Sequence, residues 1–141
     1  MSQPKKLLPS LTSPPLDFMK KNKIILFLIF LLALSFRLYG LNWDQGQHLH
    51  PDERFLTMVT TDIKLPNSIV EYFNNKTSPL NPYNYQSYQF FVYGTLPIFL
   101  TKIIAVLFKL DNYENIVLVG RVLSAFFDSI VIFLLYFLSI N

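Results

Sequence analysis

The sequence contains no cysteine, only four glycines and few charged side chains, which make up 15% of its 141 residues. The lack of cysteine excludes a disulfide scaffold, and four glycines are too few for a collagen-like repeat. Soluble domains carry about a quarter charged residues on average, well above the level found here. The chain is instead 52% hydrophobic and contains fourteen phenylalanines. A chain this apolar is not intrinsically disordered.

The basic residues are concentrated near the start of the chain, although the net charge is only +3. Five of the twelve lysines and arginines precede the first apolar run: Lys5, Lys6, Lys20, Lys21 and Lys23. Residues 24–36 follow without a single charged side chain. This order is typical of the cytoplasmic flank of a membrane protein and not of a nucleic-acid surface. It predicts that the lipid bilayer is a partner and that nucleic acid is not.

Three apolar runs predict an all-α integral membrane protein with three transmembrane helices. The helices are expected at residues 24–41, 90–110 and 116–140, since about twenty apolar residues span the hydrocarbon core. A cleaved signal peptide is the alternative for the first run, but no small-residue cleavage site follows it. The basic tail 1–23 predicts a multi-pass protein of the cell membrane with a cytoplasmic N-terminus. Loop 42–89 is then extracytoplasmic, and the short hinge 111–115 is cytoplasmic.

The extracytoplasmic loop is expected to hold one or two short juxtamembrane helices, of which an amphipathic helix at 51–65 is the clearest. Pro51 suits the first helical position, and Asp52 and Glu53 fall in the first turn, where the helix dipole favours acids. On a helical wheel Asp52 lies within about 60° of the apolar positions, whereas Glu53 shares a face with threonines. We therefore predict that Asp52 is partly desolvated, with a raised pKa that suits a general base. The alternative is that both acids only cap the helix.

Two histidines precede this helix. His48 and His50, together with Asp52 or Glu53, could ligate a divalent metal, although histidines at a membrane interface need no such role. No cofactor other than a divalent metal is suggested by the sequence.

Charged side chains near the first apolar run are candidates for binding substrate. Arg37 and Arg54 are predicted to recognise a phosphate group on the extracytoplasmic side, with snorkelling to lipid headgroups as the alternative. Asp44 is a further candidate substrate-binding residue. Within the second and third runs, Lys102 and Asp128 lie at similar depth and are predicted to pair, because intramembrane charges usually find partners. Arg121 is interpreted as part of the same structural packing.

The sequence resembles membrane glycosyltransferases of the C-type superfamily, in particular the family 39-like branch of protein O-mannosyltransferases and aminoarabinose transferases. The resemblance covers about residues 24–141. Four features carry it: Arg37 at the end of the first run, the Asp52-Glu53 pair within His-Pro-Asp-Glu-Arg-Phe, Phe91-Val92-Tyr93-Gly94 with Pro97, and the stretch from Gly120-Arg121 to Asp128.

This resemblance implies a polyprenyl-phosphate-linked sugar donor and an active site that faces outward. It makes Asp52 and Glu53 the candidate catalytic residues, with Asp52 as the base toward an acceptor hydroxyl of unknown identity. Members of the family are several times longer, with around a dozen spans. The chain is therefore expected to be an N-terminal part that is inactive alone. The alternatives are a small non-catalytic membrane scaffold or anchor, and a transporter fragment that uses its intramembrane charges.

Overall fold

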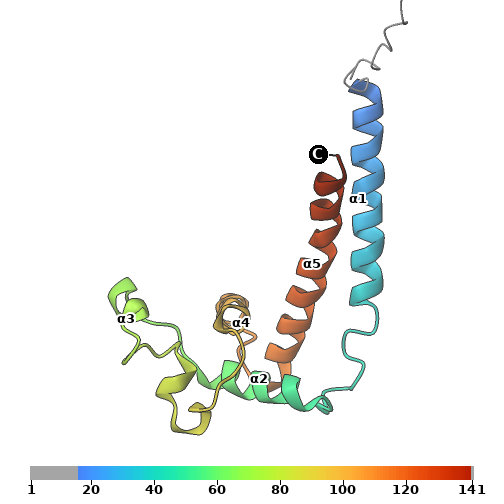
Figure 1. The fold of residues 1–141 in the computed structure, drawn as a ribbon. Coiled ribbons are helices and arrows are strands. Elements are labelled where there is room, and N and C mark those ends of the chain that lie inside the picture. Colours follow the sequence, from blue (N-terminus) through green and yellow to red (C-terminus); the bar gives the residue numbers. More distant parts are fainter. Residues whose placement is uncertain (1–15, 141) are drawn as a thin grey trace, which may run out of the picture.

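The computed structural model describes residues 16–140, and within that range every regular element is helical, as predicted. The elements in order are α1 (Leu16–Leu38), α2 (Pro51–Asp62), α3 (Ile69–Phe73), η1 (Pro82–Asn84), η2 (Gln86–Tyr88), α4 (Thr95–Leu107) and α5 (Tyr113–Ile140). In Figure 1, α1 and α5 lie side by side and the other elements gather at one end of them. We call α1 with α5 the helix pair, and residues 39–112 the lobe. Most of the predicted basic tail 1–23 lies outside the described residues.

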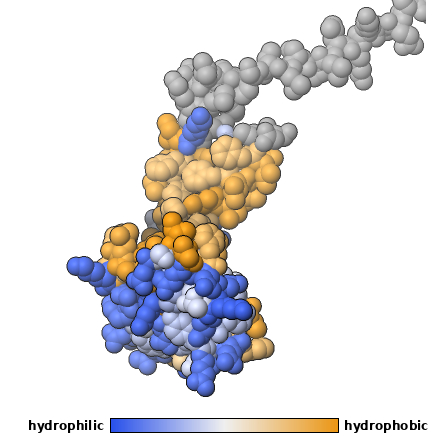
Figure 2. Space-filling view, turned by 90° about the vertical axis from the view of Figure 1, so that its left-hand side faces the viewer, coloured by the Kyte–Doolittle hydropathy of each residue, from blue (hydrophilic) through white to orange (hydrophobic). Residues whose placement is uncertain are grey.

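The helix pair is antiparallel and packs through aromatic side chains. Phe30 of α1 contacts Phe126 and Phe133 of α5, with ring centroids 6.4 and 5.0 Å away. Arg37 near the end of α1 forms an ion pair with Asp128 of α5. Many other apolar side chains of the pair are exposed, and Figure 2 shows hydrophobic residues over the pair above a mostly hydrophilic face of the lobe. An exposed apolar surface of this extent is typical of a site that contacts lipid or another protein surface.

Among the described residues, only α5 is both long and apolar enough to span a membrane, over Tyr113–Ser139. Helix α1 has 23 residues, but its charge-free stretch 24–36 covers only about 20 Å at 1.5 Å per residue. Helix α4 has 13 residues in all, which is also too few to span the hydrocarbon core. Of the three predicted transmembrane helices, one therefore has full spanning length in the structure.

The core of the lobe is a cluster of aliphatic and aromatic side chains from α2 and from the segment that precedes α4. Val59 of α2 and Ile63, directly after α2, are fully buried and cluster with Phe91. Tyr88 belongs to the same cluster, and its hydroxyl donates a hydrogen bond to Asp62 at the end of α2. Burial raises the pKa of Tyr88 to about 12. These contacts hold α2 against the rest of the lobe.

Helix α2 begins at Pro51, as predicted, but ends at Asp62 and not at residue 65. The chain leaves the helix early because the backbone N–H of Lys64 donates to the carbonyl oxygen of Pro79, 3.0 Å away. Pro66 follows and favours an extended conformation before it. The last predicted residues of the helix therefore belong to a connection that joins α2 to the loop around Pro79.

Helix α4 is much shorter than the predicted span 90–110, because the two ends of that apolar run have other roles. Phe91 is 2% exposed and belongs to the lobe core. Phe108 ends the helix, and Lys109 takes a left-handed backbone conformation with φ +58°. The apolar run thus combines core residues, a short helix and a turn.

The predicted ion pair between Lys102 and Asp128 is wrong. Lys102 is 4% exposed, and its Nζ donates to the carbonyl oxygen of Thr61, 3.0 Å away, and lies 3.7 Å from Asp111. Asp128 pairs with Arg37 instead. Because α4 does not run beside α5 as a second span, the two residues do not meet at a common depth.

The segment predicted as a cytoplasmic hinge, 111–115, lies against the segment predicted to be extracytoplasmic. The rings of Tyr113 and His48 are 4.4 Å apart, and Lys102 bridges the end of α2 and Asp111. The structure thus brings together two segments that the predicted topology assigns to opposite sides of the membrane, because α4 leads back to the end of the helix pair from which the lobe starts. The sides of the membrane stay a prediction.

The lobe core yields a test of stability. Ile63→Ala should lower the free energy of unfolding of the lobe by about 2–5 kcal/mol, because it removes a side chain with no exposed surface and leaves a cavity. Ile69→Ala is the matched control, since Ile69 is 77% exposed, and should change it by less than about 0.5 kcal/mol. Denaturant unfolding in detergent measures both. Equal losses in the two variants would contradict the described core.

Candidate functional site

The loop after α1 turns sharply and brings an aspartate to α5. Gly40 and Gly46 have φ values of +67° and +76°, which glycine adopts without strain. The N–H of Gly46 donates to the side chains of Asn42 and Asp44, at 3.1 and 3.3 Å. These local hydrogen bonds fix the loop and place Asp44, a residue that is 4% exposed, against α5.

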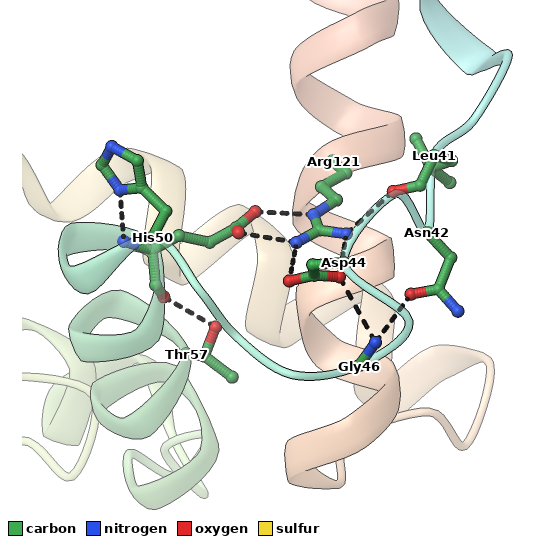
Figure 3. Close-up of polar contacts among 8 residues, drawn as sticks. Leu41, Asn42, Asp44, Gly46, His50, Thr57 and Arg121 are labelled. Atoms are coloured by element: carbon green, nitrogen blue, oxygen red, sulfur yellow. Dashed lines mark hydrogen bonds and ion pairs between the residues drawn. The ribbon is translucent and has the colours of Figure 1, made fainter.

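The guanidinium of Arg121, on the third turn of α5, lies between this loop and α2 (Figure 3). Its Nη1 and Nη2 donate to the two carboxylate oxygens of Asp44, at 3.0 and 2.7 Å. Its Nε and Nη2 donate to the two oxygens of Glu53, both at 2.7 Å. Nη1 also donates to the carbonyl oxygen of Leu41, at 2.8 Å. A guanidinium has five N–H groups, so Arg121 is fully satisfied.

This cluster is mostly removed from water and carries a net negative charge. The side chains of Arg121 and Asp44 are 10% and 1% exposed, whereas that of Glu53 is 27% exposed. The hydrogen bonds from Arg121 hold the pKa of Asp44 well below its usual range, against the opposing effect of burial. Trp43 covers the guanidinium, with its ring centroid 5.5 Å from Cζ, a distance at which cation–π attraction acts.

A cleft of about 760 Å³ opens beside this cluster, between the helix pair, α2 and α4. Its walls include Arg37, Asp52, Glu53, Arg121 and Asp128, together with threonines of α2 and α4. Two cationic and three anionic side chains therefore line it, so the cleft is slightly acidic. A volume of this size accommodates a small organic group such as a sugar.

The two arginines predicted to bind phosphate are in different places. Arg37 lines the cleft, 39% exposed at its side chain, but its guanidinium is engaged with Asp128. Arg54 is exposed on α2 and does not belong to the cleft wall. Asp44, also predicted to bind substrate, is instead held by Arg121 behind the wall.

The predicted environments of Asp52 and Glu53 are reversed in the structure. Asp52 is exposed, while Glu53 is partly buried and bound to Arg121. The helical wheel does place Asp52 on the same stripe as Leu56, and both line the cleft. Asp52 remains solvated because it lies in the first turn of α2, at the open cleft, whereas the residues further along the stripe pack into the lobe core.

The cap of α2 is supplied by His50, whose Nδ1 accepts a hydrogen bond from the N–H of Glu53 at 3.4 Å. The alternative in which the acids serve as the cap is therefore not what the geometry shows. His48 is 5% exposed, packs against the ring of Tyr113 at an angle of 43°, and its Nδ1 has no hydrogen-bond partner among the described residues. No group of three or more potential metal ligands comes together in the part of the chain that the structure describes. The metal site thus remains a prediction without a ligand set.

Beside Asp52 lies Tyr93, from the Phe-Val-Tyr-Gly stretch. The neighbouring Asp52 carboxylate raises the pKa of the Tyr93 hydroxyl. Tyr93 also packs on Phe55, one turn along α2 from Asp52, with ring centroids 6.1 Å apart. This tyrosine was not predicted as a site residue, and only its place in the stretch that resembles the family pointed to it.

The main residue that the sequence-based interpretation undervalued is Arg121. It was assigned to packing within the third apolar run, without a partner. Its partners Asp44 and Glu53 lie 77 and 68 residues away in the chain, so no local spacing could reveal them. The signal that was present is an arginine inside an apolar helix, because such a charge must find an acidic partner.

No protein-family model, no curated protein and no solved structure matches this chain. A function has to be argued from the side chains of the cleft.

The Arg121 cluster predicts a large effect of substitution. Arg121→Ala should lower the free energy of unfolding by about 3–5 kcal/mol, because it leaves two mostly buried carboxylates without their partner. Arg121→Lys should recover only part of this loss, since an ammonium group has no planar fork for two carboxylates. The control is Arg54→Ala, which changes an exposed arginine of the same lobe. A loss in Arg54→Ala as large as in Arg121→Ala would contradict the proposed cluster.

Asp44 predicts a pH dependence of stability. Its folded-state pKa is lowered, so its contribution is complete above the ordinary aspartate pKa of about 4 and is lost as the pH falls below that value. Denaturant unfolding between neutral and acidic pH should therefore show wild-type protein more stable than Asp44→Asn at pH 7. The difference should shrink as the pH falls below about 4. A difference that stays constant down to acidic pH would show that Asp44 is not ionised in the folded state.

Proposed function

We propose that this chain is the N-terminal part of a membrane glycosyltransferase that moves a sugar from a polyprenyl-phosphate carrier to an acceptor hydroxyl on the extracytoplasmic side. The observation that carries this proposal is the state of Asp52. Among the charged residues that line the cleft, the other four take part in ion pairs, whereas none of the ion pairs formed by the described residues includes Asp52. A carboxylate that faces a sugar-sized cleft and is not held in an ion pair is free to accept a proton from a bound acceptor.

In the proposed reaction, the acceptor hydroxyl oxygen forms a bond to the anomeric carbon of the donor sugar. The bond from that carbon to the carrier phosphate breaks, and the polyprenyl phosphate leaves with the bonding electrons. Asp52 accepts the proton of the acceptor hydroxyl. The neighbouring Tyr93 hydroxyl, whose pKa is raised by Asp52, stays protonated.

The leaving phosphate needs a cation, and Arg37 is the one we assign to it. Arg37 lines the same cleft, and its ion pair with Asp128 is partly exposed, at 39% and 62% of the two side chains. An exposed ion pair contributes little to stability, so a phosphate can compete with Asp128 for the guanidinium. Arg121 is not assigned this role, because all of its N–H groups are already bound.

We further propose that the helix pair crosses the membrane, with the N-terminus in the cytoplasm and the lobe outside. The exposed apolar surface of the pair and the spanning length of α5 support this. For α1, the short charge-free stretch is extended at its N-terminal end by Lys23, whose long exposed side chain can reach the headgroups. The cleft then lies where the pair meets the lobe, within reach of a lipid-borne donor.

The test is Asp52→Asn in the complete gene product. This change keeps the shape of the side chain and removes its ability to accept a proton. Transfer of radiolabelled sugar from a polyprenyl-phosphate donor should fall by roughly 10²- to 10⁴-fold, with little change in the amount of folded protein. Near-normal transfer by Asp52→Asn would end the assignment of Asp52 as the base.

Two control variants make the comparison specific. Glu53→Gln weakens the Arg121 cluster, so it should mainly reduce the amount of folded protein and have a smaller effect on turnover at matched protein. Arg54→Ala changes an exposed residue of α2 away from the cleft wall and should leave turnover near wild type. If no member of the series transfers sugar from any polyprenyl-phosphate donor, the glycosyltransferase proposal fails as a whole.

A further inference from the structure

We infer that α4 is an interfacial helix, which lies flat in the extracytoplasmic leaflet of the bilayer with one apolar face in contact with lipid, and that it does not cross the membrane. This inference depends on the helix pair being the membrane-crossing part of the chain. It does not depend on the chemistry of the cleft.

The orientation of α4 is the first observation. In Figure 1, α4 is seen nearly end-on, whereas α1 and α5 run up the page. A helix that lies across a membrane-crossing pair lies along the plane of the bilayer. Its 13 residues are about 20 Å long, too short for the roughly 30 Å hydrocarbon core.

Two contacts hold α4 in this orientation. Lys102 reaches the carbonyl oxygen of Thr61 at the end of α2, so one side of α4 is tied to the lobe. On α5, Gly120 lies beside Thr101 of α4, and a Cβ at that glycine would be 3.8 Å from the threonine side chain, an ordinary van der Waals distance. The two helices are therefore in contact where they cross.

The second observation is the distribution of apolar side chains around α4. Ile98, Lys102 and Ala105 are buried, at 3%, 4% and 0% exposed. On the opposite side, three apolar side chains lie within about 40° of one another on a helical wheel and are 74%, 47% and 73% exposed: Leu96, Ile103 and Leu107. A helix with one packed face and one bare apolar face is typical of a segment at a membrane interface.

The third observation identifies lipid as the occupant of that face. A groove of about 360 Å³ between α4 and α5 is lined mainly by apolar side chains, which include Ile104, Phe108 and Val122. The groove lies between exposed Phe108 at the end of α4, next to Leu107 of the bare face, and exposed Val122 of α5, the helix of spanning length. A surface continuous with a membrane-spanning helix meets the same acyl chains. Lys109 follows Phe108 and is exposed, so its ammonium group can reach the lipid phosphates above the inserted side chains.

The depth of α4 can be measured directly, because the chain has no cysteine of its own. The full chain with Ile103→Cys is labelled with an environment-sensitive fluorophore and reconstituted into phosphatidylcholine vesicles. A nitroxide on the lipid near the headgroup should quench the label more strongly than one near the end of the acyl chain. Leu107→Cys should give the same order, and Thr77→Cys, on an exposed part of the lobe, should be quenched by neither. Stronger quenching of the Ile103 label by the deep nitroxide overturns the inference in favour of a transmembrane helix, and the absence of quenching overturns it in favour of a face covered by protein or water.

Sidedness gives an independent measurement. In intact cells, Glu114→Cys at the start of α5 and Thr77→Cys in the lobe should react equally with a membrane-impermeant maleimide, because α4 between them does not change sides. Both side chains are exposed. If Thr77→Cys reacts and Glu114→Cys reacts only after permeabilisation, α4 crosses the bilayer and the inference is wrong. A transferase assay that fails while both positions react equally would remove the proposed function and leave this inference intact.

Discussion

A guanidinium that uses all five of its N–H groups has one orientation available to it, and Arg121 is in that state. Its acceptors come from the loop after α1 and from the first turn of α2, while Arg121 itself belongs to α5. The relative positions of the helix pair and the lobe therefore depend on this one side chain. The position of Asp52 depends on the same contact, because the hydrogen bonds between Glu53 and Arg121 fix the first turn of α2 with Asp52 at the cleft.

The start of α2 could be read from the sequence because its signals are local. Proline at the first helical position and acids in the first turn act within one turn of helix, independently of the rest of the chain. The extent of α4 could not be read in this way. Phe91 is buried in the lobe core, whereas Leu107 is exposed. Both are apolar, so they contribute equally to a hydrophobic run in the sequence. Composition does not distinguish a side chain that faces protein from one that faces lipid.

For the candidate site, the sequence predicted the face of α2 on which Asp52 lies but not whether Asp52 is buried. The helical wheel correctly placed Asp52 on the stripe of α2 that lines the cleft, since the position of a side chain around a helix is set by its sequence number. Whether Asp52 is buried depends on where other elements pack against α2. They do not cover its first turn, so Asp52 is exposed. The partners of Lys102, Arg121 and Asp128 were beyond reach for a similar reason, because each ion pair joins different elements of the fold.

The order in which the Arg121 cluster is synthesised also matters for how the chain enters a membrane. Asp44 and Glu53 are both translated well before Arg121, and in a chain whose lobe is extracytoplasmic they are already outside when α5 reaches the insertion machinery. An arginine in an inserting helix is costly on its own, by roughly 2.5–3.5 kcal/mol at the centre of a span and less toward its end. With the lobe outside, as proposed, two carboxylates are in place to pair with that arginine at the outer face. The acids of the first loop then favour the orientation of α5 that keeps Arg121 on their side of the membrane.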